Sequence, residues 1–443
     1  MNFILIFMSF CQAEQLPWWE KHPDSTLQQI IQSGLQDNPD FQAAKARIVQ
    51  AQTIAAQQKA LFLPSVRASW SSNTQPRDAL GFGFGLPDLS IPGLPQQEEE
   101  EEETSNYYTS TTMALQLNVP LDVWGSSLLN WQAADLDTQA QSLSTNQIQL
   151  SLSISVANAY YDLALAKEQK TILTEQIETA KRLLTVIEIR HDRAEASAID
   201  ILQQKQQIGN LQATLPSLDQ LLEFHRIRLA TLLGKSPEQY TSPEAELPML
   251  NQPMKLSLDL VEQRWDVQEA QTRLRASQKR EKSAKRALFP QFSLSGQMSQ
   301  QGNNIQDEWQ TLNAWALGSS VQVTLFQGGQ QWQNWQTTKA NTEIAIQILR
   351  KSQLQAQQEI TQANIQEASS YQIYLAQKQQ VQIARTLYTE SEARYTQGLL
   401  PLLNVITAQQ SYQQAQTNLL QALRDWMTAR LQIYFAAGSG DQK

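Results

Sequence analysis

The residue types that most often carry catalysis or hold metals are few in this chain and widely separated. Its 443 residues include one Cys and three His, at positions His22, His191 and His225. The chain has no HExxH motif, nucleophile elbow or phosphate-binding Gly loop, and no helix start follows the Gly-rich run from Gly81 to Gly85. The sequence therefore predicts a protein that is not an enzyme and that carries no cofactor or metal site.

The charge and hydropathy of the chain restrict the remaining classes. Its formal net charge of −9 and the lack of a basic face argue against nucleic-acid binding. A short basic stretch, Lys279 to Arg286, is expected to lie on a helix and face solvent. No stretch after residue 10 approaches the roughly 18 consecutive apolar residues of a spanning helix. A membrane location would therefore require strands or a lipid anchor.

The first residues, 1–13, have the pattern of an export signal. Met1 to Phe10 is an apolar run, and Cys11 and Ala13 follow it closely. The basic residues that usually precede such a run are missing, which leaves the true start open. Cys11 stands where a lipoprotein signal places its acylated residue, although Phe10 is larger than that cleavage site normally accepts. Two interpretations stay open: lipidation of Cys11, or ordinary cleavage after Ala13 with Cys11 removed.

Comparison of the chain with itself shows a duplication. The triplet starting at Asn130 (NWQ) recurs at Asn334, 204 positions later, and Pro64 matches Pro290 at an offset of 226. The first copy carries about 22 extra residues in a Gly/Pro-rich loop that ends in six Glu. The chain is therefore interpreted as two copies of one unit that differ mainly in one loop.

Each unit is predicted to contain helix, strand, loop, strand, long helix, turn and helix. The expected boundaries are a first repeat at 14–235, an inter-repeat linker at 236–256, a second repeat at 257–438 and a tail at 439–443. The expected strands lie at about 64–72, 108–121, 290–299 and 315–326, with the acidic loop at 73–105.

The strands are predicted from a period of two, with one apolar face and one face of small polar residues. From Met113 to Leu121, for example, apolar residues occupy every second position. This alternation fits a half-buried strand as well as a barrel strand with lipid outside and water inside.

The long helices are predicted from a heptad rhythm. Gly125 to Arg190 contains no Pro, and apolar residues from Leu152 to Ile187 keep a 4-3 spacing, as they do from Leu419 to Ala436. Such a rhythm specifies left-handed supercoiling against neighbouring helices. The remaining faces are rich in Gln, Asn, Ser and Thr. They suit either the wall of a water-filled space or an ordinary solvated face.

Four strands would force an oligomer if they entered a membrane. Single-chain bacterial barrels begin at about eight strands, and hydrocarbon does not tolerate open sheet edges. Three chains would supply twelve strands, enough for a passage. The predicted fold is thus a mixed α+β membrane fold: a homotrimeric 12-stranded β-barrel, continued by a long coiled α-helical barrel. Seven Trp flank the strands and suit an interfacial belt, with sheet-to-helix packing an equal alternative for Trp131 and Trp335.

At this point the motifs, in their order and doubling, resemble the outer-membrane efflux protein family of TolC-like channel-tunnels, including its lipoprotein branch associated with resistance-nodulation-division pumps. The resemblance covers roughly residues 16 to 438. The segments that carry it are Asn38–Asp40 with Ala60–Pro64, Arg264–Val267 with Ala287–Pro290, Leu121–Gly125 with Leu325–Gly329, Leu229–Gly234, and Arg394–Ala408.

The resemblance implies a homotrimer in the bacterial outer membrane, with its helical part in the periplasm. It also implies a periplasmic adaptor and an inner-membrane pump, proton-driven or ABC, as partners. The implied strand-to-helix joints are Gly125, Gly328 and Gly329.

The resemblance further implies a gate at the two helical turns, here 194–202 and 398–408. The residues expected at this gate, or at the adaptor contact, are Asp200, Leu399, Leu400, Leu403, Asn404 and Thr407. Leu402 is expected to close the mouth together with the other Leu residues, by packing and dewetting. Family members commonly carry acidic rings where this chain has Asn404 and Thr407. We therefore predict weak cation selectivity at the mouth.

Three functions are weighed. The first is the passive outer-membrane duct of a tripartite efflux system for drugs or toxic compounds. The second is the duct of a type I protein secretion system. The third is a soluble coiled-coil scaffold, which explains the heptads and the duplication but neither the strands with one apolar face nor the apolar N-terminal run.

Overall fold

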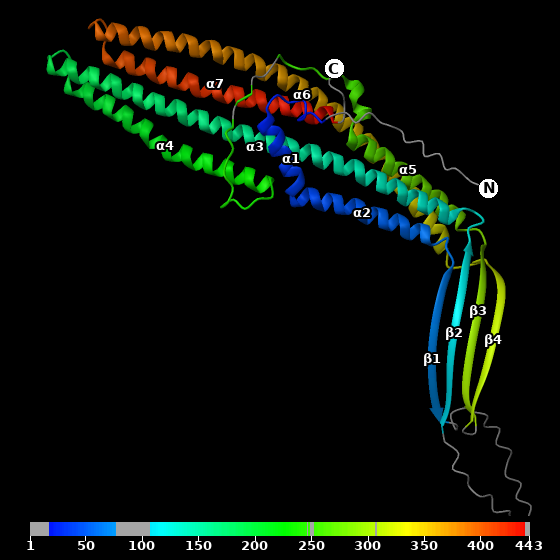
Figure 1. Cartoon of the computed structure of the whole chain (residues 1–443). Helices are drawn as coiled ribbons and strands as arrows, with labels where there is room; N and C mark the ends of the chain where they lie inside the picture. Colours follow the sequence, from blue (N-terminus) through cyan, green and yellow to red (C-terminus); the bar gives the residue numbers. More distant parts are fainter. Residues whose placement is uncertain (1–16, 77–106, 246, 249–251, 306–307, 439–443) are drawn as a thin grey trace, which may run out of the picture. The chain divides into compact units, whose positions relative to one another are not determined.

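The computed structural model describes residues 17–76, 107–245, 247–248, 252–305 and 308–438 (Figure 1). Cys11 and the six Glu of the acidic loop lie outside these residues. The chain forms two compact units. The larger one comprises the described residues within 1–50, 137–274 and 345–443, and the smaller one comprises those within 51–136 and 275–344.

The described elements follow the duplicated order expected from the sequence. They are α1 (Ser25–Asp37), α2 (Pro39–Ala60), β1 (Ser65–Pro76), β2 (Tyr107–Leu121), α3 (Ser126–Asp192), α4 (Ala198–Leu232), a 3-10 helix (Leu258–Gln263), α5 (Trp265–Arg286), β3 (Gln291–Ile305), β4 (Glu308–Gln322), α6 (Gln330–Thr396) and α7 (Leu402–Ala437).

The duplication is visible in the lengths of the helices. Helices α2 and α5 both have 22 residues, and their bounds match at the offset of 226 found in the sequence. Helices α3 and α6 both have 67 residues, and α4 and α7 have 35 and 36. None of the helices in the described part of the chain is long and apolar enough to cross a membrane.

The smaller unit contains one antiparallel sheet in the order β1-β2-β3-β4. Two strand predictions were too short. Strand β1 continues to Pro76, so residues 73–76 belong to the strand and not to the acidic loop, and β3 continues to Ile305. Strand β2 begins at Tyr107, one residue before the expected position. The added residues pair in register with their neighbours, and ladder hydrogen bonds hold polar residues in a strand without any apolar alternation.

The fourth strand prediction was displaced towards the C-terminus. Strand β4 runs from Glu308 to Gln322, where 315–326 was expected. Its first residues are mostly polar, which hid them from a search for alternation, but they pair with the end of β3. Leu325 and Phe326 lie beyond the strand and are almost fully exposed.

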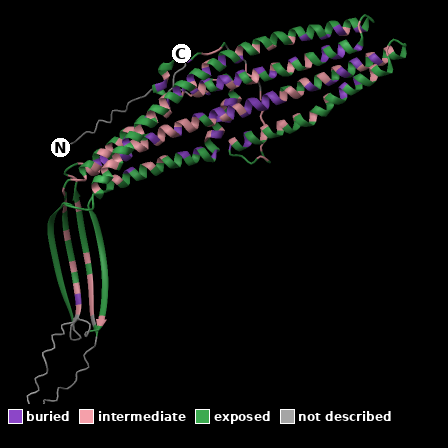
Figure 2. Cartoon of the chain, turned by 180° about the vertical axis from the view of Figure 1, so that it is seen from behind, coloured by how far each residue is buried: buried purple, intermediate pink, exposed green. Residues whose placement is uncertain are grey.

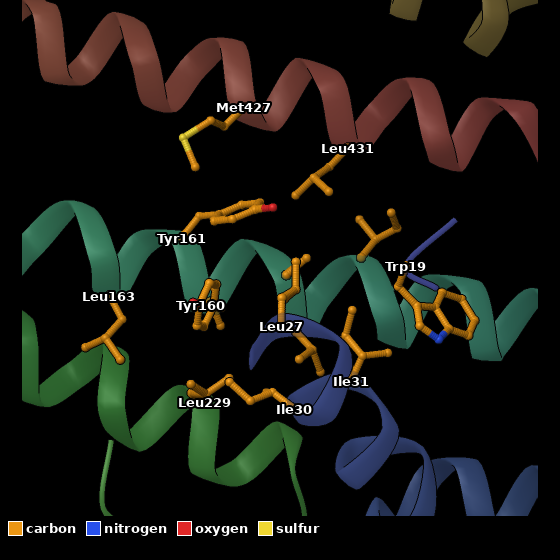
Figure 3. Packing of buried hydrophobic residues seen from close by; sticks show 14 of the residues in the cluster. Trp19, Leu27, Ile30, Ile31, Tyr160, Tyr161, Leu163, Leu229, Met427 and Leu431 are labelled. Atoms are coloured by element: carbon orange, nitrogen blue, oxygen red, sulfur yellow. The ribbon is translucent and has the colours of Figure 1, made fainter. Parts of the chain in front are cut away.

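The larger unit has its main core where α1 packs among α3, α4 and α7. Figure 3 shows Leu27 and Ile31 of α1 beside Tyr160 of α3, with Leu229 of α4 and Leu431 of α7 around them. All five side chains are at most 2% exposed. The core consists of apolar and aromatic side chains from four helices, and burying such side chains is the main stabilising term in folding.

The heptad seam of α3 was predicted correctly at most of its positions. Val156, Leu163 and Ile187 are buried, as expected for a helix that packs along its length. The seam prediction was wrong at Leu184, which is half-buried, because the neighbouring Leu183 points inward and is fully buried. Figure 2 shows that the buried residues lie mainly along the helices, whereas the strands are mostly exposed.

Candidate functional site

The sheet has one apolar and one polar face, and the pairing register keeps the two faces separate across all four strands. Trp70 of β1 pairs with Met113, and Leu115 of β2 pairs with Met298, which in turn pairs with Trp315. On the other face Arg67 pairs with Gln116 and Ser293 with Ser320, whose hydroxyls are 2.7 Å apart. An error of one residue in any register would mix the faces. The sheet is therefore two-sided by construction.

The apolar face of the sheet is highly exposed in the single chain. Trp315 and Leu317 of β4 are 78% and 77% exposed, and Met298 of β3 is 65% exposed. The strands are 12 to 15 residues long, which exceeds the roughly 9–11 residues of a tilted transmembrane strand. Within the described residues, β1 and β4 each pair on one side only. The sheet thus has the length, the sidedness and the open edges of a segment of a membrane wall.

Five of the seven Trp residues near the strands fall into two groups. Trp70, Trp309 and Trp315 are exposed on the strands themselves. Trp131 and Trp335, which occupy matching places in the two repeats, are half-buried, and each ring lies under a Lys ammonium group at 5.6 Å and 5.8 Å. The first group suits an interfacial belt. The second packs where strands give way to helices.

The first strand-to-helix joint is built around Gly125. Its φ of +70° favours glycine, and an added Cβ would lie 2.9 Å from Nη1 of Arg286. The same Nη1 donates to the carbonyl of Trp124 at 2.8 Å, and the Trp124 indole donates to the carbonyl of Pro290 at 2.8 Å. Asp122 completes the joint by accepting from the backbone N–H of Leu128 at the start of α3.

The second joint repeats the backbone conformation but not the contacts. Gly328 and Gly329 have φ of +59° and +78°, and open space surrounds the place of a Cβ at both. All three predicted joint glycines therefore lie between a strand and a long helix in a conformation that other residues rarely adopt.

The residues predicted for the mouth divide into an exposed set and a buried set. Leu399, Leu403, Asn404 and Thr407 are exposed, and Leu400 is half-buried. The placement of Leu402 was wrong: it is 3% exposed and packs with Leu183, Tyr388 and Tyr395 in a small core. Helical geometry explains the difference, since Leu402 shares the inner face of α7 with Val405 and Ile406.

Asp200 has a structural function in the first turn. Its carboxylate accepts from the backbone N–H of Ser197 at 2.8 Å, and the Ser197 hydroxyl accepts from the backbone N–H of Asp200 at 3.2 Å. The pair forms a capping box that starts α4. In the single chain the turn therefore uses this carboxylate to cap the helix.

Arg190 joins the two turns and was not singled out by the sequence. Its side chain is 14% exposed, its guanidinium lies 4.5 Å from the centre of the Tyr395 ring, and it donates to the Tyr395 carbonyl. Burial raises the pKa of the Tyr395 hydroxyl, which Arg190 partly opposes. The matching residue of the second repeat, Arg394, is 62% exposed. The sequence holds no signal for this contact, because both repeats carry Arg at this place and only their packing differs.

The described residues contain no group of three His, Cys, Asp or Glu that could hold a metal ion. The two-sided sheet and the paired helical turns are the features with a geometry that suits a channel.

Comparison with known proteins agrees with this geometry. The model of the family described as "Outer membrane efflux protein" matches residues 30–235 and 256–439. The chain belongs to the outer membrane efflux protein family. Members of this family are channel proteins rather than enzymes, and the protein is accordingly an outer-membrane efflux channel with its helical part in the periplasm.

Relatives match this efflux channel over almost its full length. It is 26% identical over 431 residues to the pyoverdine export outer membrane protein OpmQ of Pseudomonas aeruginosa, covering 96% of this chain and 87% of that protein. It is 24% identical over 435 residues to the antibiotic efflux pump outer membrane protein ArpC of Pseudomonas putida, covering 97% and 86%. The solved structure of the outer-membrane channel OprN shares its fold, with a TM-score of 0.81, 24% identity and coverage of 97% and 93%.

Proposed function

We propose that three copies of this chain form a homotrimer, in which twelve strands close a β-barrel in the outer membrane and the long helices continue it as a hollow tunnel. The observation that carries the proposal is the mainly apolar face shared by the four strands, in a sheet whose outer strands β1 and β4 each pair on one side only within the described residues. Four strands are too few to close a barrel, and open edges are not tolerated in hydrocarbon. Two copies would give a filled interior, whereas three give a passage.

The function of this assembly is passive export of drugs or toxic compounds, with a periplasmic adaptor and an inner-membrane pump as partners. Family membership and the relatives named for pyoverdine export and antibiotic efflux support it. The alternative is the duct of a type I protein secretion system, because a tunnel of this kind accepts what its partners deliver. The third function weighed, a soluble coiled-coil scaffold, is wrong because the chain is an outer-membrane channel.

The turns of 194–202 and 398–408 form the periplasmic mouth in this proposal. The exposed face of Leu399, Leu403, Asn404 and Thr407 closes the mouth or docks the adaptor, with Leu400 beside it and Asp200 capping the neighbouring turn. Because Asn404 and Thr407 carry no charge, the mouth attracts cations weakly. Single-channel recording of strong cation selectivity in the wild type that is lost in Asn404→Ala would contradict this.

Two further parts of the proposal concern processing and boundaries. The mature chain carries an acylated Cys11 or begins after Ala13, and the intact mass of the purified protein distinguishes the two forms. The repeats at 14–235 and 257–438, joined at 236–256, are proposed as the units of the ancestral duplication, with 1–13 as the signal and 439–443 as the tail.

The experiment that tests the proposed function is mild crosslinking in cells, detergent solubilisation and mass spectrometry of the proteins that co-purify with the tagged chain. The expected result is a crosslinked trimer with an adaptor and a proton-driven pump. An ABC exporter in their place would favour secretion. Release of the chain by high salt without detergent would contradict both.

A further inference from the structure

A basic stripe on α5 has no counterpart on the matching helix of the first repeat. It consists of Arg275, Lys279, Lys282 and Arg286, whose 4-3-4 spacing places them on one side of the helix. At the offset of 226 the first repeat has Val49, Thr53, Ala56 and Ala60 on α2. The two helices have the same length, so the stripe is not a feature that the fold requires.

The C-terminal end of the stripe, at Arg286, lies where the apolar face of the sheet ends. Arg286 is the last residue of α5, and its guanidinium donates to the Trp124 carbonyl. The Trp124 ring in turn lies 5.1 Å from the ring of Phe289 and 6.5 Å from that of Phe292 on β3. Trp124 and Phe289 are 42% and 49% exposed. The Arg286 guanidinium and the aromatic rings of Trp124 and Phe289 therefore lie together at the end of the sheet nearest the helices.

A hollow of about 330 Å³ opens at this place. Its lining includes Arg286, Trp124, Phe292 and the hydroxyl residues Ser126 and Ser127. Asp122 also lines it, but its carboxylate is engaged by the start of α3. The Ser126 hydroxyl donates to the Ser283 carbonyl, so the hollow offers the Arg286 cation, the Ser127 hydroxyl and aromatic surface side by side. This is the chemistry that a phosphate head group with attached acyl chains requires.

The stripe keeps its charge available. Lys282 and Arg286 are exposed, and no carboxylate in the described part of the chain forms an ion pair with either. Lys279 donates to the side chain of Gln132, a neutral partner, at 2.9 Å. A local excess of positive charge in a chain of net charge −9 is complementary to an anionic surface.

We propose that Lys282 and Arg286 bind the phosphate head groups of anionic phospholipids at the end of the sheet nearest the helices. The proposal rests on the membrane insertion of the sheet proposed above. With a rise of 1.5 Å per residue, Lys282 lies about 6 Å and Arg275 about 16 Å along the helix from Arg286. Only the first distance falls within the Debye length of about 8 Å at physiological salt. The contribution to binding must therefore decrease from Arg286 to Arg275.

The test is native mass spectrometry of the full-length protein in detergent with equal amounts of phosphatidylglycerol and phosphatidylethanolamine. The wild type is expected to retain phosphatidylglycerol preferentially. Lys282→Gln with Arg286→Gln should reduce this preference by about 25-fold, since each cation near an anionic surface contributes about fivefold. Lys282→Gln alone leaves the Trp124 contact intact and should reduce it about fivefold. Arg275→Gln, the matched control on the same stripe, should leave it unchanged.

Equal retention of the two lipids by the wild type, or an unchanged preference in the double variant, would overturn the proposal. A change in the ion selectivity of the reconstituted channel without any change in lipid preference would also overturn it, because the stripe would then face the duct. In each case the retention of neutral lipid still reports membrane insertion. A failure of head-group recognition is thus separable from a failure of the proposed function, in which no lipid is retained at all.

Discussion

The helices of the larger unit pack differently at two places along their length. Around α1 the core is apolar, with Leu27, Ile31 and Leu229 all fully buried (Figure 3). Towards the turns, α4 and α7 instead meet through a layer of side-chain amides, which we call the amide layer. Its members are Gln204, Gln207, Gln409 and Gln413.

The amide layer is buried but incompletely hydrogen-bonded. Gln409 is 2% exposed, and neither atom of its amide has a hydrogen-bond partner among the described residues. Gln204 donates to the Ala180 carbonyl at 2.8 Å, while its own carbonyl is unpaired in that same part of the chain. Buried polar groups without partners cost free energy. The difference predicts that the apolar core around α1 contributes more to the stability of the protomer than the amide layer does.

The largest expected effect is at the apolar core. Leu27→Ala should lower the free energy of unfolding by about 2–5 kcal/mol, because Leu27 is 0% exposed and its loss leaves a cavity. Chemical unfolding in detergent measures the change. Leu403→Ala, which removes an exposed Leu of the turn, is the control and should have almost no effect. Equal losses in the two variants would break the comparison.

The next effect concerns the contact between the two turns. Arg190→Ala should destabilise the turn end by about 2 kcal/mol, because it removes a charged donor from a buried site. Hydrogen exchange should rise in residues 394–404 and remain unchanged in α1. Arg394→Ala, at the matching place of the second repeat, should leave exchange as it is. Faster exchange across the whole larger unit would contradict a function of Arg190 that is confined to the contact between the two turns.

A stabilising substitution is expected within the amide layer. Gln409→Leu should raise the free energy of unfolding by about 1 kcal/mol, since it replaces an unpaired buried amide with an apolar side chain of similar size. Gln410→Leu is the matched control: the Gln410 amide donates to Gln207 at 3.0 Å, so its loss should destabilise. If both substitutions destabilise equally, Gln409 has a partner in the assembled protein.

The smallest effect is a pH dependence at the apolar core. Burial lowers the pKa of His22, which Asp24 partly opposes, and Nδ1 of His22 accepts from the Asp24 backbone N–H. As the pH falls, His22 is therefore protonated in the unfolded chain before it is protonated in the folded chain. The free energy of unfolding decreases as the pH falls below about 6.5 towards the lowered pKa of His22. Unfolding midpoints at several pH values should decline less steeply in His22→Gln.

The sequence predicted the architecture well because the architecture depends on periodicity. The heptad rhythm predicted α3 nearly to its ends, and the duplication then predicted α6. The prediction of strand β4 was displaced because the first residues of this strand are mostly polar. They are held by pairing with β3, which no local sequence pattern reveals.

The turn end was predicted less well because single-residue packing decides it. Gln204 and Gln409 are of a type that is usually exposed, so their burial was not expected. Asp200 was interpreted as a gate residue, whereas in the single chain its carboxylate completes a capping box with Ser197. The serine three residues before Asp200 was the signal for this, and it is present in the sequence.

The measurement that tests the account most directly concerns the two faces of the sheet. A Cys introduced at Leu317 on the apolar face, or at Ala316 on the polar face, can be labelled with a polarity-sensitive dye. Cys11 does not compete for the label, because it is acylated under one interpretation of the N-terminal signal and removed under the other. In lipid vesicles, the label at 317 should report an apolar environment and be quenched by a lipid-bound quencher, while the label at 316 responds to an aqueous quencher. If both labels report water, the sheet is not a membrane wall and the account is wrong.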